Sequence, residues 1–327
     1  MPDSTPVPTE IRKASTAAIA FAAELLRQGQ VAAVPTETVY GLAADAANGE
    51  AVARIYAAKG RPAFNPVIVH VSGLAMALRY AEFPPLALRL AAAFWRGPLT
   101  LVLKARADAP VSALIMAGLP TIALRAPAHP VMLRLVRELG RGVAAPSANV
   151  SGKLSPTCAE HVRHSLGGRI PLILDGGASK AGIESSIVAV TGDSARILRL
   201  GAIAPEAIDT IIGARVPRPA DPPAANNGAD GNAVQAPGML LHHYAPGLPL
   251  RLDAETAGAE EFHIGFGAIA GDATLSASGD SIEAASNLFA LLHQADASGR
   301  RGIAVAPIAD AGLGSAINDR LRRAARG

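Results

Sequence analysis

The order of apolar and polar positions along the first two thirds of the chain changes repeatedly between two patterns. Apolar residues at helical spacing predict helices over 15–29, 49–59, 84–94, 129–139, 157–166 and 205–212. Short apolar runs predict strands at 31–34, 67–71, 99–105, 121–127, 143–149, 171–177, 185–192 and 195–201. Early alternation followed by three consecutive strands predicts an α/β fold with a mixed, twisted sheet and flanking helices.

A second, shorter α/β pattern follows a break in the apolar pattern. Residues 215–238 hold Pro, Ala, Asn, Gly and Asp with almost no large apolar side chains, which predicts a linker. The chain is thereby divided into residues 1–214 and a small domain at 248–327. In the small domain we expect strands at 262–267 and 302–308, helices at 281–296 and 315–325, and a parallel pair of strands. Residues 239–250, "MLLHHYAPGLPL", are too apolar and aromatic for a simple tether.

Composition and charge exclude several classes of protein. No apolar run reaches the roughly 18 residues that a membrane span needs, and Glu24 and Arg27 interrupt the first long one at helical spacing. The single cysteine, Cys158, rules out an internal disulfide and a multi-cysteine metal site. These features predict a cytoplasmic protein. The net charge of +3 permits an anionic ligand without indicating bulk nucleic-acid binding.

Polar clusters stand where predicted strands meet loops, which is the usual place for sites in α/β proteins. They supply cations, hydroxyls and amides, in the stretches "PTETVYGL" (35–42), "KGRPAFNP" (59–66), "ALRAP" (123–127), "APSANVSGKLSPT" (145–157), "GIESSIVAV" (182–190) and "ILRLG" (197–201). Taken singly, Lys59 and Arg61 could be a basic helix end that complements the helix dipole, and Arg125 could be a solvated strand-edge charge. Together the clusters suit a polyanionic nucleotide and phosphoryl or nucleotidyl transfer. A phosphate-binding loop that ends in Lys-Ser/Thr is absent, as is a nucleophile with a paired base.

The same stretches, in this order, resemble the threonylcarbamoyl-AMP synthases in their two-domain form. The resemblance covers nearly the whole chain from about residue 12, including "PGMLLHHYAPGLPL" (237–250) and "GLGSAINDRLRRAA" (312–325). It implies a YrdC-like catalytic domain at 1–214, a linker and active-site lid at 215–247, and a small Rossmann-like α/β domain at 248–327. It also implies that L-threonine, bicarbonate and ATP condense to threonylcarbamoyl-AMP and pyrophosphate, with downstream proteins transferring the threonylcarbamoyl group to tRNA.

The resemblance further implies two sets of site residues. The residues matching positions around L-threonine are Thr36, His70, Arg125, Ala145 and Ser185. The residues matching positions around ATP are Lys59, Arg61, Asn65, Thr121, Ser147, Ser155, Arg199 and Tyr244. Mg²⁺ is expected with ATP, without a protein ligand that can be named, and no organic cofactor is expected. Glu37 has no implied catalytic role; it could orient its turn or act through magnesium.

Two other classes of function are compatible with an anion-binding α/β protein. One is an RNA-binding module with a basic groove, although the sequence has few aromatic residues for base stacking and lacks a basic stripe. The other is a carbamoyl-transfer accessory domain of a larger enzyme. Stable binding to nucleic acid or to a membrane is not expected. Threonine-dependent release of pyrophosphate from ATP would distinguish the synthase from both alternatives.

Overall fold

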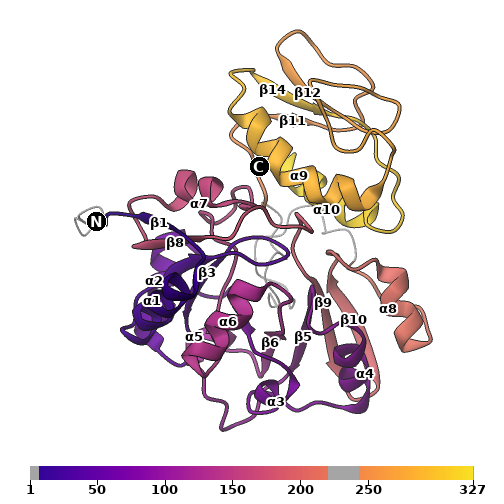
Figure 1. Ribbon diagram of the computed structural model, residues 1–327. Helices are drawn as coiled ribbons and strands as arrows, with labels where there is room; N and C mark the ends of the chain where they lie inside the picture. Colours follow the sequence, from indigo (N-terminus) through magenta and orange to yellow (C-terminus); the bar gives the residue numbers. More distant parts are fainter. Residues whose placement is uncertain (1–6, 220–242, 327) are drawn as a thin grey trace.

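The computed structural model describes residues 7–219 and 243–326, which form two α/β units of unequal size (Figure 1). Within these residues the larger unit has a ten-stranded mixed sheet in the order β1-β8-β2-β3-β7-β4-β6-β5-β9-β10. The strands are β1 (Glu10–Lys13), β2 (Ala32–Val34), β3 (Gly41–Asp45), β4 (Ile68–His70), β5 (Leu99–Lys104), β6 (Thr121–Arg125), β7 (Val143–Ala144), β8 (Leu172–Asp175), β9 (Ser186–Thr191) and β10 (Ser194–Arg199). β4 and β6 are parallel, whereas β9 and β10 are antiparallel.

Helices cover both faces of this sheet, and each buries one apolar stripe. One face is covered by α1 (Thr16–Arg27) and α6 (Pro130–Leu139), packed over β8, β2, β3 and β7. The opposite face is covered by α2 (Gly49–Lys59), α3 (Leu74–Ala77), α4 (Pro85–Phe94), α5 (Ala113–Met116), α7 (Ala159–Leu166) and α8 (Pro205–Ile212). The strands β4, β6, β5 and β9 therefore keep one face that α1 and α6 do not cover.

The end of α2 shows how the sequence fixes one functional segment. Asn48 caps the start of this helix by accepting from the N–H groups of Glu50 and Ala51. Gly60 ends it in the left-handed conformation at φ 59°. Pro62 then prevents the helix from continuing. Lys59 and Arg61 are consequently held at a defined turn rather than on a continuing helix.

The mixed sheet with flanking helices predicted from the pattern is confirmed, but two strands of the large sheet were not predicted. β1 reads Glu-Ile-Arg-Lys and lies at the sheet edge, where its one apolar residue, Ile11, is exposed and gives no apolar run. β3 consists mainly of glycine and alanine, so its hydrophobic pattern is weak although all five residues are buried. The strand predicted at 143–149 shortens to β7, since Pro146 cannot donate a ladder hydrogen bond.

The smaller unit has a four-stranded sheet within the described residues, in the order β11-β14-β12-β13. Its elements are β11 (Leu250–Arg251), β12 (Glu261–Gly265), β13 (Ala273–Thr274), α9 (Ser281–Asp296), β14 (Gly302–Val305) and α10 (Gly314–Ala324). The expected parallel pair is confirmed as β12 and β14. The finer Rossmann-like description of this unit stays a prediction.

The segment between the two units is described only in part. Residues 215–219 follow α8, and the Ile197 N–H donates to the Pro217 carbonyl at 2.9 Å, which ties this start of the predicted linker to β10. Residues 220–242 lie outside the described part, and with them Met239, Leu240 and Leu241 of the predicted lid. The segment resumes at His243 and Tyr244. The domain boundaries predicted at 214 and 248 stay predictions.

Helices α9 and α10 lie on the side of the small sheet that faces the large unit (Figure 1). From α10, the Arg320 guanidinium forms an ion pair of 3.0 Å with Glu184 of the large unit. From α9, His293 stacks on His161 of α7 with ring centroids 3.8 Å apart. Gly182 lies so close to α9 that an added Cβ would come within 2.3 Å of the Ser286 carbonyl oxygen. The two units are therefore joined by close and specific contacts.

Among residues 7–219 and 243–326, no helix combines the length and the apolar character that crossing a membrane requires.

The stacked histidines predict how pH affects the docking of the two units. Burial and the neighbouring His293 lower the pKa of His161 to about 4, and burial also lowers the pKa of His293. The folded protein thus binds fewer protons than the unfolded chain between about pH 6.5 and pH 4, so stability falls as pH drops through this range. Melting temperatures measured from pH 7.5 to pH 5 should fall less steeply for His161→Gln than for the wild type.

His164, exposed on the same helix, provides the matched control. His164→Gln should change the slope much less than His161→Gln does, since its imidazole does not lie in the stack and acts on it only through its charge. Equal slopes for all three proteins would contradict this role of the stacked pair.

Candidate functional site

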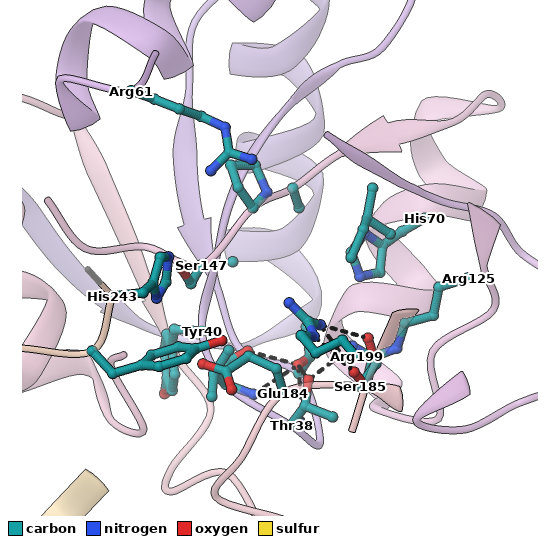
Figure 2. Close-up of a pocket in the computed structure, with 17 residues that line it drawn as sticks. Thr38, Tyr40, Arg61, His70, Arg125, Ser147, Glu184, Ser185, Arg199 and His243 are labelled. Atoms are coloured by element: carbon teal, nitrogen blue, oxygen red, sulfur yellow. Dashed lines mark hydrogen bonds between the residues drawn. The ribbon is translucent and has the colours of Figure 1, made fainter. Parts of the chain in front are cut away.

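A pocket lies where several strands of the large sheet end, on the face of β4, β6 and β5 that α1 and α6 do not cover (Figure 2). His70 and Arg125 are register partners at the ends of the parallel strands β4 and β6. Thr100 of β5 is the partner of Arg125 on its other side. The lining residues are Thr36, Thr38, Val39, Tyr40, Gly41, Arg61, Ile68, His70, Arg125, Ala145, Pro146, Ser147, Glu184, Ser185, Arg199, His243 and Tyr244. The sheet thus brings segments distant in sequence to one place.

The pocket holds little free space. The space among its lining residues is about 530 Å³ when open solvent is included, but the free volume inside it is about 40 Å³. The smaller value is the one to compare with ligand pockets, which usually measure roughly 300–1,000 Å³. A nucleotide therefore enters this site only if lining side chains move.

The acid in "PTETVYGL" makes a buried ion pair. Glu37 Oε1 lies 2.7 Å from Arg125 Nη2, and the carboxylate also accepts the N–H groups of Ala128 and His129 at 3.0 and 3.2 Å. Burial opposes ionisation, but Arg125 and the Ala128 N–H outweigh it and lower the pKa of Glu37 to about 2. Glu37 therefore connects the turn after β2 to Arg125 and to the start of α6.

The two threonines beside Glu37 form the turn itself. The Thr36 hydroxyl donates to the Val39 carbonyl at 2.6 Å and lies 2.8 Å from the Thr38 hydroxyl. Arg125 Nη1 donates to Thr38 at 2.8 Å and Arg125 Nε donates to the Gly97 carbonyl at 3.2 Å. The hydroxyls around one acid thus orient an arginine whose planar fork faces the pocket.

The turn after α2 gathers cations in a second part of the site. Arg61 lines the pocket, and its Nη2 donates at 2.7 Å to both the Asn65 side-chain oxygen and the Pro66 carbonyl. The Lys59 ammonium donates to the Ser147 and Asn149 carbonyls at 2.6 and 2.5 Å. Burial lowers the pKa of Arg61 to about 10 and lowers that of Lys59 well below its usual value. The protein thus holds positive charge where burial disfavours it.

Ser185 connects the two predicted parts of the site. Its hydroxyl lies 2.8 Å from that of Thr100, and Arg199 Nη2 donates to the same hydroxyl at 3.1 Å. Arg199 also donates twice to the Ser185 carbonyl (Figure 2). A residue assigned to the threonine side therefore directly contacts one assigned to the ATP side.

His70 brings a neutral imidazole to the pocket. Burial and the charge of Arg125 lower its pKa to about 3. Neither ring nitrogen meets hydrogen-bond geometry with a described group. One nitrogen of a neutral imidazole donates and the other accepts, so the ring can hydrogen-bond a ligand hydroxyl.

Two aromatic residues after the undescribed segment occupy the other side of the pocket. His243 and Tyr244 are buried, with ring centroids 4.1 Å apart, and both line the pocket. Tyr244 adopts φ 66°, a conformation that costs a non-glycine residue about 1–3 kcal/mol. Its buried hydroxyl has no partner among the described residues. Contacts elsewhere must hold this residue in place.

The structure brings together nine of the thirteen predicted site residues. They are Thr36, His70, Arg125, Ala145 and Ser185 from the threonine set, and Arg61, Ser147, Arg199 and Tyr244 from the ATP set. Lys59 and Asn65 lie behind the lining and hold it through the hydrogen bonds above. Ser155 likewise lies behind it and donates to Glu184 at 2.5 Å. Thr121 starts β6, four residues or roughly 13 Å along the strand from Arg125.

Glu184 is a lining residue that sequence reasoning did not select. It stands beside Ser185 in "GIESSIVAV", so the motif was visible, but its partner Arg320 is 136 residues away. The sequence carries no signal for that pairing.

A protein-bound Mg²⁺ does not fit the described residues. Among them there is no group of three or more His, Cys, Asp or Glu side chains placed to hold a metal ion. The carboxylate that lines the pocket, Glu184, is already paired with Arg320. Any Mg²⁺ that enters with a nucleotide would be held mainly by phosphate and water oxygens.

The fold and the pocket define a class of protein: a two-unit α/β protein with a pocket lined by arginines and hydroxyl groups where sheet strands end. The family model described as "Telomere recombination", for Sua5, YciO and YrdC proteins, matches residues 24–201. The model described as "Threonylcarbamoyl-AMP synthase, C-terminal domain" matches residues 203–326.

Individual relatives agree with these matches. A threonylcarbamoyl-AMP synthase of Pyrococcus abyssi is 38% identical, with 94% of this chain and 93% of that protein covered. One of Bacillus subtilis is 47% identical over 72% of this chain and 66% of its own length. The solved structure of P. abyssi Sua5 complexed with L-threonine superposes with a TM-score of 0.86 at 36% identity, covering 98% of each chain. The chain belongs to the threonylcarbamoyl-AMP synthase family, which confirms the resemblance drawn from its sequence.

The Glu37–Arg125 pair predicts the effect of removing one charge. Glu37→Gln should lower the free energy of unfolding by about 2–3 kcal/mol at pH 7, because Arg125 loses its buried counter-charge. The depressed pKa of Glu37 contributes stability that is complete above about pH 4.5 and is lost as pH falls towards 2. The gap between wild type and variant in urea denaturation should therefore narrow from pH 7 to pH 3.5.

The exposed Glu50 at the start of α2 is the control. Glu50→Gln should cost less than about 0.5 kcal/mol. A gap for Glu37→Gln that stays constant with pH would show that its carboxylate charge is not what stabilises the fold.

Proposed function

We propose that this chain is an L-threonylcarbamoyladenylate synthase, which condenses L-threonine, bicarbonate or CO₂, and ATP to threonylcarbamoyl-AMP and pyrophosphate. The observation that carries the proposal is the single pocket shared by residues of both predicted sets, in a chain of this family. The P. abyssi structure titled as a complex with L-threonine supports the same ligand here. Downstream proteins that pass the threonylcarbamoyl group to tRNA are the expected partners, and a cytoplasmic location suits that role.

The chemistry needs positioning and charge neutralisation rather than a covalent intermediate. The threonine nitrogen bonds to the carbon of CO₂ and loses a proton, which gives a carbamate. A carbamate oxygen then bonds to the α-phosphorus of ATP, and the bond to the pyrophosphate oxygen breaks. Arg125 and His70 are proposed to hold threonine, while Arg61 and Arg199 offset the negative charge of the phosphates. The small free volume of the pocket supports this scheme, because it leaves little room for water, which hydrolyses such intermediates.

An RNA-binding module without catalysis is less well supported. The cations of the pocket are buried inside it rather than arranged along a surface groove. Pyrophosphate release that requires ATP, bicarbonate and threonine together tests the proposal directly. Its absence in the intact protein would refute it.

The polar groups around the proposed threonine position predict which amino acid the enzyme prefers as substrate. His70 lines the pocket with a buried neutral imidazole that can hydrogen-bond a ligand hydroxyl. Serine lacks one methyl group and should lose about 10–200-fold in kcat/KM, whereas valine leaves the imidazole unpaired and should lose more. Pyrophosphate release measured with the three amino acids should rank threonine above serine above valine. Equal rates would refute this assignment of the pocket.

Matched Arg→Lys changes separate the two sides of the site. Arg125→Lys keeps the positive charge, but a lysine cannot contact Glu37, Thr38 and Gly97 together. The planar guanidinium that would bind the threonine carboxylate is lost, so the KM for threonine should rise about 10–100-fold. Arg61→Lys should instead raise the KM for ATP by a similar factor. The measurement is initial rate with one substrate varied at a time. An effect of Arg125→Lys on the KM for ATP alone would contradict the division.

A further inference from the structure

Arg320 of the small unit is completely buried at the boundary with the pocket-bearing unit. It is the largest fully buried side chain among the described residues, with 0% of its surface exposed. Nε lies 3.0 Å from Glu184 Oε2, and Nη1 donates to Asp319 at 2.9 Å. A buried arginine is costly unless its charge is matched. The first of these partners comes from the other unit, so Arg320 spans the boundary.

Its partner Glu184 lines the pocket and connects to a second predicted site residue. Glu184 Oε1 accepts a hydrogen bond from the Ser155 hydroxyl at 2.5 Å, while Oε2 accepts one from Arg320 Nε at 3.0 Å. Both carboxylate oxygens are therefore engaged, and a short chain of contacts runs from Ser155 through Glu184 to α10. The position of a pocket carboxylate thus depends on a residue from outside the pocket.

The same guanidinium contacts Tyr244. Its carbon lies 5.3 Å from the centre of the Tyr244 ring, within the range of a cation–π interaction. Phe289 of α9 packs on this ring as well, with centroids 5.6 Å apart. Tyr244 has a strained backbone conformation, and such strain persists only where surrounding contacts determine it. The small unit supplies two of those contacts.

We propose that Arg320 is a positioning residue for the nucleotide side of the pocket: by holding the Glu184 carboxylate and the Tyr244 ring together, it makes the small unit part of the ATP site. This inference rests on the proposed function only for the identity of the nucleotide. The small unit would then do more than anchor the segment that carries Tyr244. Threonine binding, around Arg125 and His70, should depend on Arg320 much less.

The test uses the full-length protein and measures the Kd for ATP by calorimetry, together with the KM for ATP and for threonine. Arg320→Met alone leaves Glu184 buried without its partner and is expected to lower the melting temperature. The double variant Glu184→Gln, Arg320→Met removes both charges and should recover most of that stability. Arg322→Met is the control, since Arg322 lies on the same helix in an exposed ion pair with Asp310.

The double variant should bind ATP about 10-fold or more weakly, the loss expected when a charged contact is removed. Its KM for threonine should change less than about threefold, and Arg320→Lys should restore ATP binding only in part. Arg322→Met should behave as the wild type. Recovery of both stability and ATP affinity in the double variant would overturn the proposal, because Arg320 would then serve stability alone.

Failure of this inference is distinguishable from failure of the proposed function. Wild-type protein that binds ATP but releases no threonine-dependent pyrophosphate would refute the function, and the ATP Kd of the variants would still decide the role of Arg320. An active wild type whose double variant keeps its ATP affinity would refute the role of Arg320 and leave the function intact.

Discussion

Burial of positive charge without an equal number of carboxylates is the constraint on which the site depends. Lys59 and Arg61 are held by carbonyl and amide oxygens, which orient them but do not cancel their charge. Burial lowers the pKa of both groups, so the folded protein bears a cost for keeping them ionised. A polyanion in the pocket, as the proposed function requires, would relieve that cost.

Two carboxylates near the pocket each form an ion pair with an arginine and fix its position. Glu37 forms an ion pair with Arg125 and accepts a hydrogen bond from the Ala128 N–H, just before α6. It therefore connects the turn after β2 to the start of that helix. Glu184 forms an ion pair with Arg320 and so ties the two units together. Glu184 is buried and Glu37 is partly buried with 14% of its side chain exposed, and each is also hydrogen-bonded to further groups, as such an ion pair requires. The Glu37–Arg125 pair connects two segments of the large unit, and the Glu184–Arg320 pair connects the large unit to the small one.

The small free volume of the pocket bears on the proposed function. Tyr244 and His243 line the pocket, and the free volume among the lining residues is about 40 Å³. Binding therefore requires side chains to move, while the reaction proposed here requires water to stay out. Contacts from α9 and α10 hold the Tyr244 ring against the small unit.

The sequence by itself determined the class of fold and pointed to a candidate site. Apolar spacing predicted most of the alternating helices and strands, and polar clusters beside the strands, together with the family resemblance, pointed to residues such as Thr36, Arg61 and Arg125. Two weakly patterned strands were not predicted: β3 is mainly glycine and alanine, and β1 is mainly polar at the sheet edge. Only the tertiary structure decided that Lys59, Asn65 and Ser155 lie behind the pocket rather than in it. It alone paired Glu184 with Arg320, since a contact between residues 136 positions apart depends on how two units dock and leaves no trace in local periodicity.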